Sequence, residues 1–466
     1  MGRSAIVLAA GLGTRMKSKR HKVLHEVCGK PMILHILDEL EKLELNQVIV
    51  VVGQQKEAVS AVVADRAEIA VQEQQLGTGH AVQAAAGLLN AENDTTVVLY
   101  GDAPLIRAET LERLLTEREA REASATVLTA DVRNPHGLGR VILGSGGLVD
   151  RIVEEKDASP EEREIHLINT GIYAYQTSDL LDSLQHLTPE NAQGEYYLTD
   201  TLEILRNAGK PVYAVQVDDE REIASVNDRA QLAVVEGILR ERICEYWARQ
   251  GVTIINPAHT YIGLDVKIGR DSVILPGSIL EGKTVIGEDC VVGPNSRLSN
   301  VTLHDRVTVE QSVLVDSEVG SDTTVGPFAY VRPGSRIGEH VKIGDFVEIK
   351  NSAIGDCTKV SHLAYVGDAE IGQRVNIGCG VITVNYDGEH KHKTVVGDDS
   401  FVGSNVNLIA PVKIGKGAYL CAGSTITDEV PDDGFAIGRS RQVTKGDYVK
   451  AWKLKKGQNV RKGSRS

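Results

Sequence analysis

An aliphatic residue recurs every six positions through most of the second half of the chain. The series begins at Ile262, Ile268, Ile274, Leu280, Ile286, Val292 and Leu298, resumes at Val301, and can be followed to Ile426. A repeat this short cannot bury its own apolar face, so it must stack on copies of itself. The spacing predicts a triangular coil, a parallel β-helix with one aliphatic side chain per face pointing inward.

The first half alternates short apolar runs with helical patterns. We expect strands at residues 4–9, 47–52 and 96–100, and helices at residues 31–43 and around residues 79–89. Continuous apolar strands joined by helices are typical of a parallel sheet covered on both faces. This half is therefore predicted to be a three-layer α/β domain with a parallel sheet.

A helix at residues 228–250 separates the two patterns. Its apolar residues recur at helical spacing on one face, and Gly251 ends it. The predicted organisation is an α/β domain at residues 1–227, a helical linker at 228–251, the β-helix at 252–438 and a basic tail at 439–466.

Composition and charge argue against a membrane protein, a disulfide-stabilised protein and a nucleic-acid-binding protein. No apolar run in the 466 residues approaches the ~20 that a membrane span needs. The six cysteines form no CxxC pair and are too sparse for a disulfide framework, so a cytoplasmic protein is expected. A formal charge of −13 argues against nucleic-acid binding. The basic tail is expected to be solvated, although its first residues could close a site for a polyanionic ligand.

A glycine-rich loop follows the first predicted strand. Gly11 and Gly13 let the backbone approach a ligand, and Arg15 and Lys22 follow them. Met16 stands where a dinucleotide-binding fingerprint has its third glycine, which disfavours an oxidoreductase. Two cations beside a glycine loop instead suit the polyphosphate of a nucleoside triphosphate.

Two further residues are candidates for holding Mg²⁺. Asp102 follows the strand at 96–100, and ligands of open α/β sheets bind beyond such strand ends. A single carboxylate there suits Mg²⁺, which takes one or two protein oxygens plus phosphates. Asp102 could instead cap the next helix, and Asn227 could be the N-cap of the helix at 228–250; both roles stay open.

The ordered motifs of the chain closely resemble those of a known family. They are LAAGLGTRM (8–16), KVLH (22–25), QLGTGHA (75–81), YGD (100–102), GLGR (137–140), VEEKD (153–157), INTG (168–171) and GEYYLTD (194–200). They are similar to sugar-1-phosphate nucleotidyltransferases. With the joined repeat, the chain resembles the bacterial bifunctional N-acetylglucosamine-1-phosphate uridylyltransferase/glucosamine-1-phosphate acetyltransferase family. One departure is His21, where that family usually has proline.

The resemblance implies a Rossmann-like nucleotidyltransferase domain followed by a left-handed parallel β-helix. It implies that UTP and the sugar nucleotide are bound by Leu8, Ala9, Ala10, Gly11, Lys22, Gln72, Gly77, Thr78, Tyr100, Gly101, Asp102, Gly139, Glu154, Asn169 and Asn227. Within this set, Asp102 and Asn227 would hold Mg²⁺, and the sugar pocket would be lined by Gly139, Glu154, Asn169 and Asn227. Arg15 and Lys22 are expected to be catalytic through charge neutralisation.

The repeat is broken by a polar stretch at residues 385–393, which predicts a loop projecting from the coil.

His362 is either a hydrogen-bonded surface residue or a general base, and the resemblance favours the base. The resemblance also implies a sugar-phosphate site of Arg332, Lys350, Tyr365, Asn376, Asn385 and Tyr386, to which Lys391 is added from the loop, and an acetyl-CoA site of Cys379, Ser404, Ala422 and Arg439. Cys379 is expected to be a small buried side chain and not a nucleophile.

The implied function is acetyl transfer from acetyl-CoA to glucosamine 1-phosphate, then uridylyl transfer from UTP to form UDP-N-acetylglucosamine, a precursor of peptidoglycan. Sites between three parallel coils predict a homotrimer acting on small molecules, with no membrane span. Two alternatives remain: a nucleotidyltransferase whose β-helix serves only assembly, and a non-catalytic exchange-factor subunit of translation initiation.

Overall fold

The structure is a computed structural model that describes residues 2–89, 93–190 and 194–463. The chain divides into two compact units. The N-terminal unit comprises the residues up to Arg249 together with Tyr261–Leu264, and the C-terminal unit comprises Gln250–Thr260 and the residues from Asp265 onward. Each unit is described separately.

The N-terminal unit is built on one sheet. Its strands are β1 (Gly2–Ala9), β4 (Gln47–Val52), β5 (Glu68–Val71), β6 (Asn93–Tyr100), β7 (Ala125–Asp131), β8 (Arg140–Leu143), β9 (Val149–Val153), β10 (Leu167–Gln176) and β11 (Val212–Gln216). The main path runs β11-β7-β10-β6-β1-β4-β5, and β8 and β9 attach beside β10. A separate hairpin pairs β2 (Glu26–Val27) with β3 (Lys30–Pro31).

The prediction of a parallel sheet is wrong in one respect, because the sheet is mixed. β1 pairs in parallel with β4 and β6, but β10 runs antiparallel to both β6 and β7. The apolar character of a strand reports that both of its faces are buried and carries no information about direction. The antiparallel direction of β10 could therefore not be predicted from the pattern of apolar residues.

Helices cover both faces of this sheet. They are α1 (Met32–Leu40), α2 (Lys56–Val63), α3 (Thr78–Ala86), α4 (Ala108–Ala120), α5 (Pro160–Arg163), α6 (Thr177–Gln185) and α7 (Asp200–Asn207). Side chains of β1 alternate between two cores: Ala5 and Val7 pack with α1, α2 and α4, whereas Ile6 and Leu8 pack with α3, α6 and α7. The predicted three layers are confirmed, with the sheet in the middle.

The helix predicted at residues 228–250 is α8 (Arg229–Arg249), and it lies in the N-terminal unit. Val235 of this helix packs in a small core with Met16 and Met32, beside Leu232 and Leu239. Near the middle of the helix, the guanidinium of Arg240 lies over the Tyr261 ring of β13 (Tyr261–Ile262), 4.6 Å from the ring centroid.

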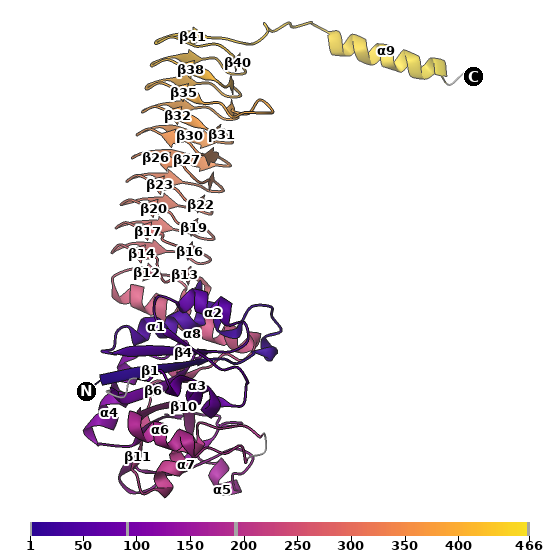
Figure 1. The fold of residues 1–466 in the computed structure, drawn as a ribbon. Coiled ribbons are helices and arrows are strands. Elements are labelled where there is room, and N and C mark those ends of the chain that lie inside the picture. Colours follow the sequence, from indigo (N-terminus) through magenta and orange to yellow (C-terminus); the bar gives the residue numbers. More distant parts are fainter. Residues whose placement is uncertain (1, 90–92, 191–193, 464–466) are drawn as a thin grey trace. The chain divides into compact units, whose positions relative to one another are not determined.

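The C-terminal unit is the predicted parallel β-helix (Figure 1). Its first sheet contains β12 (Thr253–Ile254), β15 (Val273–Ile274), β18 (Val291–Val292), β21 (Thr308–Val309), β24 (Thr324–Val325), β27 (Lys342–Asp345), β30 (Lys359–His362), β33 (Asn376–Ile377), β36 (Phe401–Val402), β39 (Tyr419–Leu420) and β41 (Phe435–Ala436). Its second sheet contains β16 (Ile279–Glu281), β19 (Arg297–Ser299), β22 (Val313–Val315), β25 (Tyr330–Val331), β28 (Glu348–Lys350), β31 (Tyr365–Gly367), β34 (Ile382–Val384), β37 (Asn407–Ile409) and β40 (Thr425–Ile426). Its third sheet contains β14 (Lys267–Ile268), β17 (Val285–Ile286), β20 (Thr302–Leu303), β23 (Glu318–Val319), β26 (Arg336–Ile337), β29 (Ala353–Ile354), β32 (Ala369–Ile371), β35 (Thr394–Val396) and β38 (Val412–Ile414).

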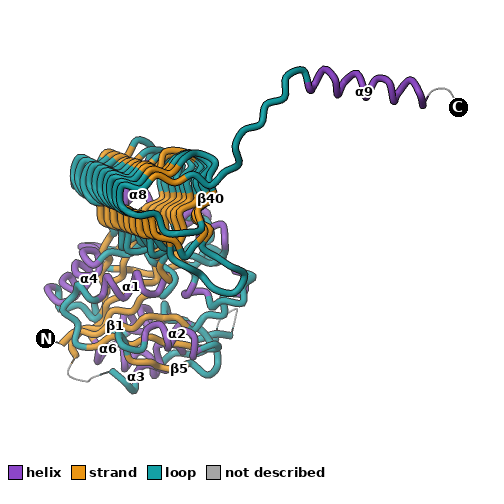
Figure 2. The backbone as a smooth tube through the Cα atoms, turned by 90° about the horizontal axis from the view of Figure 1, so that it is seen from above, coloured by secondary structure: helices purple, strands orange, loops and turns teal. Residues whose placement is uncertain are grey.

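The hexapeptide positions fill the interior of the coil. Ile274, Leu280 and Val292 have no exposed surface, and Ile286 is almost fully buried. Seen from above, successive coils lie over one another with strands on the faces and turns at the corners (Figure 2). Because each strand pairs with the strand one coil further on, every residue has a defined neighbour in the next coil.

The break in the repeat forms the predicted loop. It leaves the coil after β34 and returns at β35, with a bridge between Tyr386 and Lys391. Within the tail, α9 (Tyr448–Gly463) is a helix. In the described part of the chain, no helix combines the length and the apolar character needed to cross a membrane.

Two valines on neighbouring strands test how far the interior of the coil determines stability. Val292 is fully buried, whereas the side chain of Val285 is 39% exposed. Val292→Ala should lower the unfolding free energy of the β-helix by about 2 kcal/mol, because two buried methyl groups are lost and a cavity remains. Val285→Ala should cost less than about 1 kcal/mol. Urea denaturation measures both, and equal losses would contradict this packing.

Candidate functional sites

A cavity of about 280 Å³ opens at the carboxyl ends of β1 and β6. Its walls include ten of the predicted nucleotide-binding residues: Leu8, Ala9, Ala10, Gly11, Lys22, Gln72, Gly77, Thr78, Tyr100 and Asp102. Val23, Gln75, Ala81 and Glu195 also line it and were not predicted. The predicted residue Gly101 lies beside the cavity, where its amide donates to the carbonyl of Leu8 at 2.9 Å.

The two glycines of the loop have different roles. A side chain at Gly11 would meet no atom within 4 Å, so the backbone there is open to a ligand. Gly13 has φ +61°, and a Cβ atom built on it would lie 2.6 Å from Cβ of Lys22. Glycine at position 13 therefore lets the lysine stem pass directly against the loop.

Lys22 is the centre of a polar cluster at the mouth of this cavity. Its Nζ donates to a carboxylate oxygen of Asp102 and, at 2.8 Å, to Oδ1 of Asn227. Arg15 donates to the same Oδ1 at 2.8 Å. The structure thus brings together the four residues that the sequence analysis selected for charge neutralisation and metal binding.

The alternative of a capping role for Asn227 is wrong. The N-cap of α8 is Asp228, whose Oδ1 accepts from the amide of Gln231 at 2.9 Å. The side chain of Asn227 is therefore left to contact Lys22 and Arg15. Oxygens of Asp102 and Asn227 meet at one ammonium group, so this pair fits a cation that takes two protein oxygens. Among the described residues, no group of three or more His, Cys, Asp or Glu side chains is placed to hold a metal ion.

Interactions around Gln72 and Thr78 shape the opposite wall. The Gln72 side chain donates to the carbonyl of Gly77 at 3.0 Å. The Thr78 hydroxyl accepts from the amide of Leu198 at 3.0 Å, which ties the start of α3 to the GEYYLTD motif. Gly77 has φ +112°, where any larger residue would be strained and would also strike Tyr196.

Three of the four residues predicted to line the sugar pocket, Gly139, Glu154 and Asn169, lie together, whereas the fourth, Asn227, contacts Lys22. The amide of Asn169 donates to the carbonyl of Gly139 at 2.8 Å. A Cβ atom on Gly139 would lie 3.2 Å from a carboxylate oxygen of Glu154. The side-chain nitrogen of Asn169 also donates to the hydroxyl of Tyr173 at 2.9 Å, and this bond fixes the orientation of the Asn169 side chain.

His21, the residue that departs from the family pattern, is buried. Only 5% of it is exposed, and neither ring nitrogen has a hydrogen-bond partner among the described residues. Burial, together with the charges of Lys22 and His25, lowers the pKa of His21. The loop that precedes Lys22 is therefore built around a neutral imidazole.

In the C-terminal unit, residues at one corner of the coil form a column. Asp345, His362, Cys379, Ser404 and Ala422 each lie two residues beyond an aliphatic position of the first sheet, and those positions pair from coil to coil. Arg439 approaches the top of this column, with its Cδ 3.6 Å from where a Cβ of Gly423 would lie. The predicted base and the predicted acetyl-CoA residues therefore share one edge. Asn376 lies on the same sheet in β33.

The expectation that Cys379 is buried is wrong, because this side chain is exposed. Cys379 lies at the corner before Gly380, which has φ +75°, and corner side chains point away from the aliphatic interior. The hexapeptide period identifies which residues point inward, and Cys379 lies two residues after the inward Ile377.

The residues predicted to bind the sugar phosphate lie at another corner of the coil, where the strands of the second sheet end. We call Arg332, Lys350 and Lys391 the basic cluster. Lys350 donates to Oδ2 of Asp368 at 3.1 Å, and Arg332 donates to Glu348 at 2.7 Å. Although partial desolvation opposes it, the hydrogen bond to Asp368 raises the pKa of Lys350.

Lys391 completes the basic cluster from the loop. The neighbouring ammonium of Lys350 is the main cause that lowers the pKa of Lys391, and the charge of Arg332 adds a smaller effect in the same direction. Like charges that meet in this way favour a bound anion. Asn385, predicted within the projecting loop, is instead 7% exposed and donates to Asp368 and, at 3.5 Å, to the hydroxyl of Tyr365. Tyr386 is exposed on the loop.

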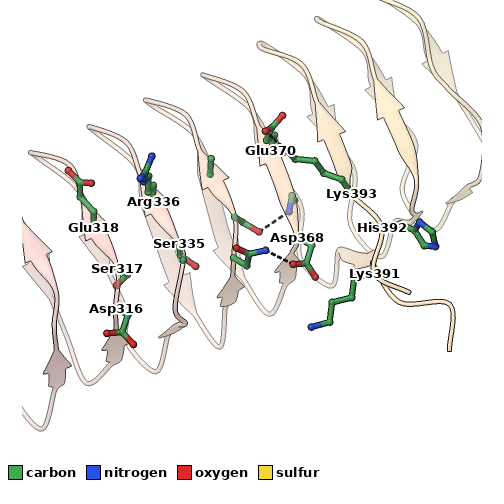
Figure 3. Close-up of a pocket in the computed structure, with 15 residues that line it drawn as sticks. Asp316, Ser317, Glu318, Ser335, Arg336, Asp368, Glu370, Lys391, His392 and Lys393 are labelled. Atoms are coloured by element: carbon green, nitrogen blue, oxygen red, sulfur yellow. Dashed lines mark hydrogen bonds and ion pairs between the residues drawn. The ribbon is translucent and has the colours of Figure 1, made fainter. Parts of the chain in front are cut away.

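A groove of about 870 Å³ runs along this edge. Figure 3 shows Asp368 and Glu370 on the coil beside Lys391, His392 and Lys393, where the loop returns. Lys393 forms an ion pair with Glu370, and His392 lies 2.6 Å from a carboxylate oxygen of Asp387. The first contact holds the returning end of the loop against the coil, and the second joins the two arms of the loop. The sequence analysis missed Asp368, which joins Lys350, Asn351 and Asn385.

The two units define a nucleotidyltransferase-type α/β domain and a left-handed hexapeptide β-helix. The family described as MobA-like NTP transferase domain matches residues 5–195. The family described as bacterial transferase hexapeptide (six repeats) matches residues 265–300, 316–351 and 393–428. Both predicted fold classes are confirmed.

Relatives named "Bifunctional protein GlmU" match nearly the full chain. The protein from Geobacillus sp. (strain WCH70) is 53% identical over 97% of this chain and 99% of its own length. The protein from Brevibacillus brevis is 55% identical over 96% of each. A solved CMP:2-keto-3-deoxy-manno-octonic acid synthetase covers 52% of this chain and 98% of its own at 20% identity, with a TM-score of 0.40, a likeness too slight to add to the assignment. The chain belongs to the GlmU family, which confirms the predicted bifunctional transferase.

Two glycines with positive φ test the packing of the loop against Lys22. Gly13→Ala should lower kcat/KM for pyrophosphate release on the order of 100-fold, because the new methyl group displaces the lysine. Gly146→Ala is the control: Gly146 has φ +70° and nothing within 4 Å, so it shares the backbone strain without the collision. Similar losses in both variants would contradict the proposed packing.

The buried imidazole of His21 predicts a dependence of stability on pH. A histidine whose pKa is lowered by folding stabilises the fold above its unfolded pKa of about 6.5, and that stability is lost as the pH falls below this value. His21→Pro suits the observed φ of −58° and removes the titrating group. Between pH 7 and pH 5, thermal unfolding of the N-terminal unit should shift less in this variant than in the wild type. Equal shifts would show that His21 does not contribute.

Proposed function

We propose that the cavity beyond β1 and β6 transfers a uridylyl group from UTP to N-acetylglucosamine 1-phosphate. The observation that supports this most directly is the meeting of Lys22, Arg15, Asp102 and Asn227 beside a glycine loop. Parallel strands place this group where α/β sheets bind ligands. The sugar moiety would lie against Gly139, Glu154 and Asn169.

The reaction needs no covalent intermediate with the protein. An oxygen of the sugar phosphate attacks the α-phosphorus of UTP in line, the bond to the β-phosphate breaks, and pyrophosphate leaves. Arg15 and Lys22 reduce the repulsion between the two anions and orient the triphosphate. Asp102 and Asn227 would hold Mg²⁺, which supplies further charge neutralisation when bound. Lys22 contacts the same two oxygens, and it can replace these contacts by contacts with the phosphate groups of UTP.

We further propose that the C-terminal unit acetylates glucosamine 1-phosphate. Arg332, Lys350 and Lys391 bind its phosphate, and Asn376, Asn385, Tyr365 and Tyr386 orient the sugar. His362 takes a proton from the amine as the nitrogen attacks the thioester carbonyl; the C–N bond forms, the C–S bond breaks, and coenzyme A leaves as a thiol. Acetyl-CoA lies along Cys379, Ser404 and Ala422, with Arg439 on a phosphate group.

The acetyl-transfer site is proposed to form between three copies of the chain. The column with His362 follows strands of the first sheet, whereas Lys350 of the basic cluster ends a strand of the second sheet, so the two lie at different corners of the coil. Parallel packing can therefore bring one corner of a copy against the other corner of a second copy. Phe328, Phe346 and Leu363 support this packing: they are more than half exposed at one corner and have φ of 60°, 56° and 39°. Bulky residues rarely adopt such angles. We place the reaction in the cytoplasm, where UTP and acetyl-CoA are available.

Substitutions in one unit should abolish one activity and spare the other. Lys22→Ala or Asp102→Ala should reduce pyrophosphate release at least about 100-fold while coenzyme A release continues. His362→Ala should reduce coenzyme A release by about 100-fold or more and spare pyrophosphate release. Free thiol and pyrophosphate measured on each variant test these assignments. Wild-type activity in any of the three would refute the role of that residue, and joint loss of both activities would point to misfolding.

A further inference from the structure

Asp345 lies one coil below His362 and contacts it directly. The parallel pairing of β27 and β30 places Asp345 opposite His362, and Oδ1 of Asp345 is 2.6 Å from Nδ1 of His362. A contact this short between an imidazole and a carboxylate is a strong, charge-assisted hydrogen bond. The bond uses Nδ1, so Nε2 is left for another partner.

The backbone is shaped to bring this pair together. The other strands of the first sheet are two residues long in the described structure, whereas β27 and β30 each have four and extend to Asp345 and His362. A Cβ atom on Gly344 would lie 1.9 Å from the carbonyl oxygen of Ser361, so only glycine permits this close approach. The amide of Leu363 also donates to the carbonyl of Asp345 at 2.8 Å.

A second histidine–carboxylate pair in the coil provides a comparison. Nε2 of His304 lies 2.9 Å from a carboxylate oxygen of Glu318, and both side chains are about as exposed as those of His362 and Asp345. This pair engages the other ring nitrogen and lies outside the predicted acetyl-CoA column. It is therefore a matched pair for which we expect no catalytic effect.

We propose that Asp345 is a positioning residue for acetyl transfer, one that fixes the ring of His362 with its proton on Nδ1 so that Nε2 can accept the proton of the attacking amine. The inference rests on the proposed role of His362 as the base. Once the proton is transferred, the carboxylate also stabilises the imidazolium that forms, and Asp345 itself stays ionised. The hydrogen bond from His362 holds the pKa of Asp345 below its usual value, in agreement with an ionised partner.

Replacement of the carboxylate by an amide tests this proposal. Asp345→Asn should lower kcat for coenzyme A release about 10- to 100-fold, because the ring loses its fixed tautomer. The KM values for acetyl-CoA and glucosamine 1-phosphate should stay within about twofold, since the proposal has Asp345 act on the His362 ring and not on a substrate. Pyrophosphate release by the same protein should be unchanged. Glu318→Gln, the same change beside His304, should leave every parameter unchanged.

Chemical rescue separates a positioning role from a structural one. Asp345→Ala should lose acetyl transfer, and added formate should restore part of it by occupying the vacated carboxylate position. Formate should not restore His362→Ala. Retention of the wild-type kcat in Asp345→Asn, a loss expressed only in KM, or a loss in Asp345→Ala that formate leaves unchanged would each overturn the proposal. If His362→Ala kept acetyl transfer, the proposed function itself would fail, so the two failures are distinguishable.

Discussion

Parallel strand pairing is the constraint on which both functional sites depend. In the N-terminal unit, the register of β1 with β6 sets Leu8 opposite Tyr100, so the glycine loop and Asp102 emerge at the same edge. In the C-terminal unit, the same kind of pairing repeats at every coil and sets His362 above Asp345. Residues far apart in sequence become neighbours because the aliphatic side chains must face the interior. This requirement allows the hydrogen-bonded strands only one register.

In both sites, a lysine ammonium forms an ion pair with a carboxylate. Lys22 pairs with Asp102, and Lys350 pairs with Asp368, in each case beside a second positive side chain. Both ion pairs are largely shielded from water, so a phosphate that takes the place of the carboxylate keeps the lysine ammonium paired. The basic cluster is therefore organised before the substrate arrives. In this way an acidic protein presents positive charge at the places where sugar phosphates and nucleotides are proposed to bind.

Periodicity alone was sufficient to predict the β-helix, the first strands and the three-layer arrangement. It could not show that β10 runs antiparallel, because burial on both faces is independent of direction. For Cys379 the period was informative, because it marks Ile377 and not Cys379 as an inward position, in agreement with the exposure of Cys379. Asp345 and Asp368 were not predicted from the sequence, and both contact partners that lie one coil away. The coil length of about 17 residues was the available signal, since subtracting it from His362 gives Asp345. The role of Asn227 needed the structure, because only the geometry shows that Asp228 caps α8.

The central claim is that one chain carries two chemistries in sequence, acetyl transfer before uridylyl transfer. The most direct test incubates the wild-type protein with glucosamine 1-phosphate, UTP and Mg²⁺, with and without acetyl-CoA, and follows free thiol and pyrophosphate together. We predict that pyrophosphate appears only when acetyl-CoA is present, after a lag during which thiol accumulates, and that N-acetylglucosamine 1-phosphate removes both the lag and the requirement. Pyrophosphate release from glucosamine 1-phosphate at full rate without acetyl-CoA, or thiol release that is never followed by pyrophosphate, would contradict the account.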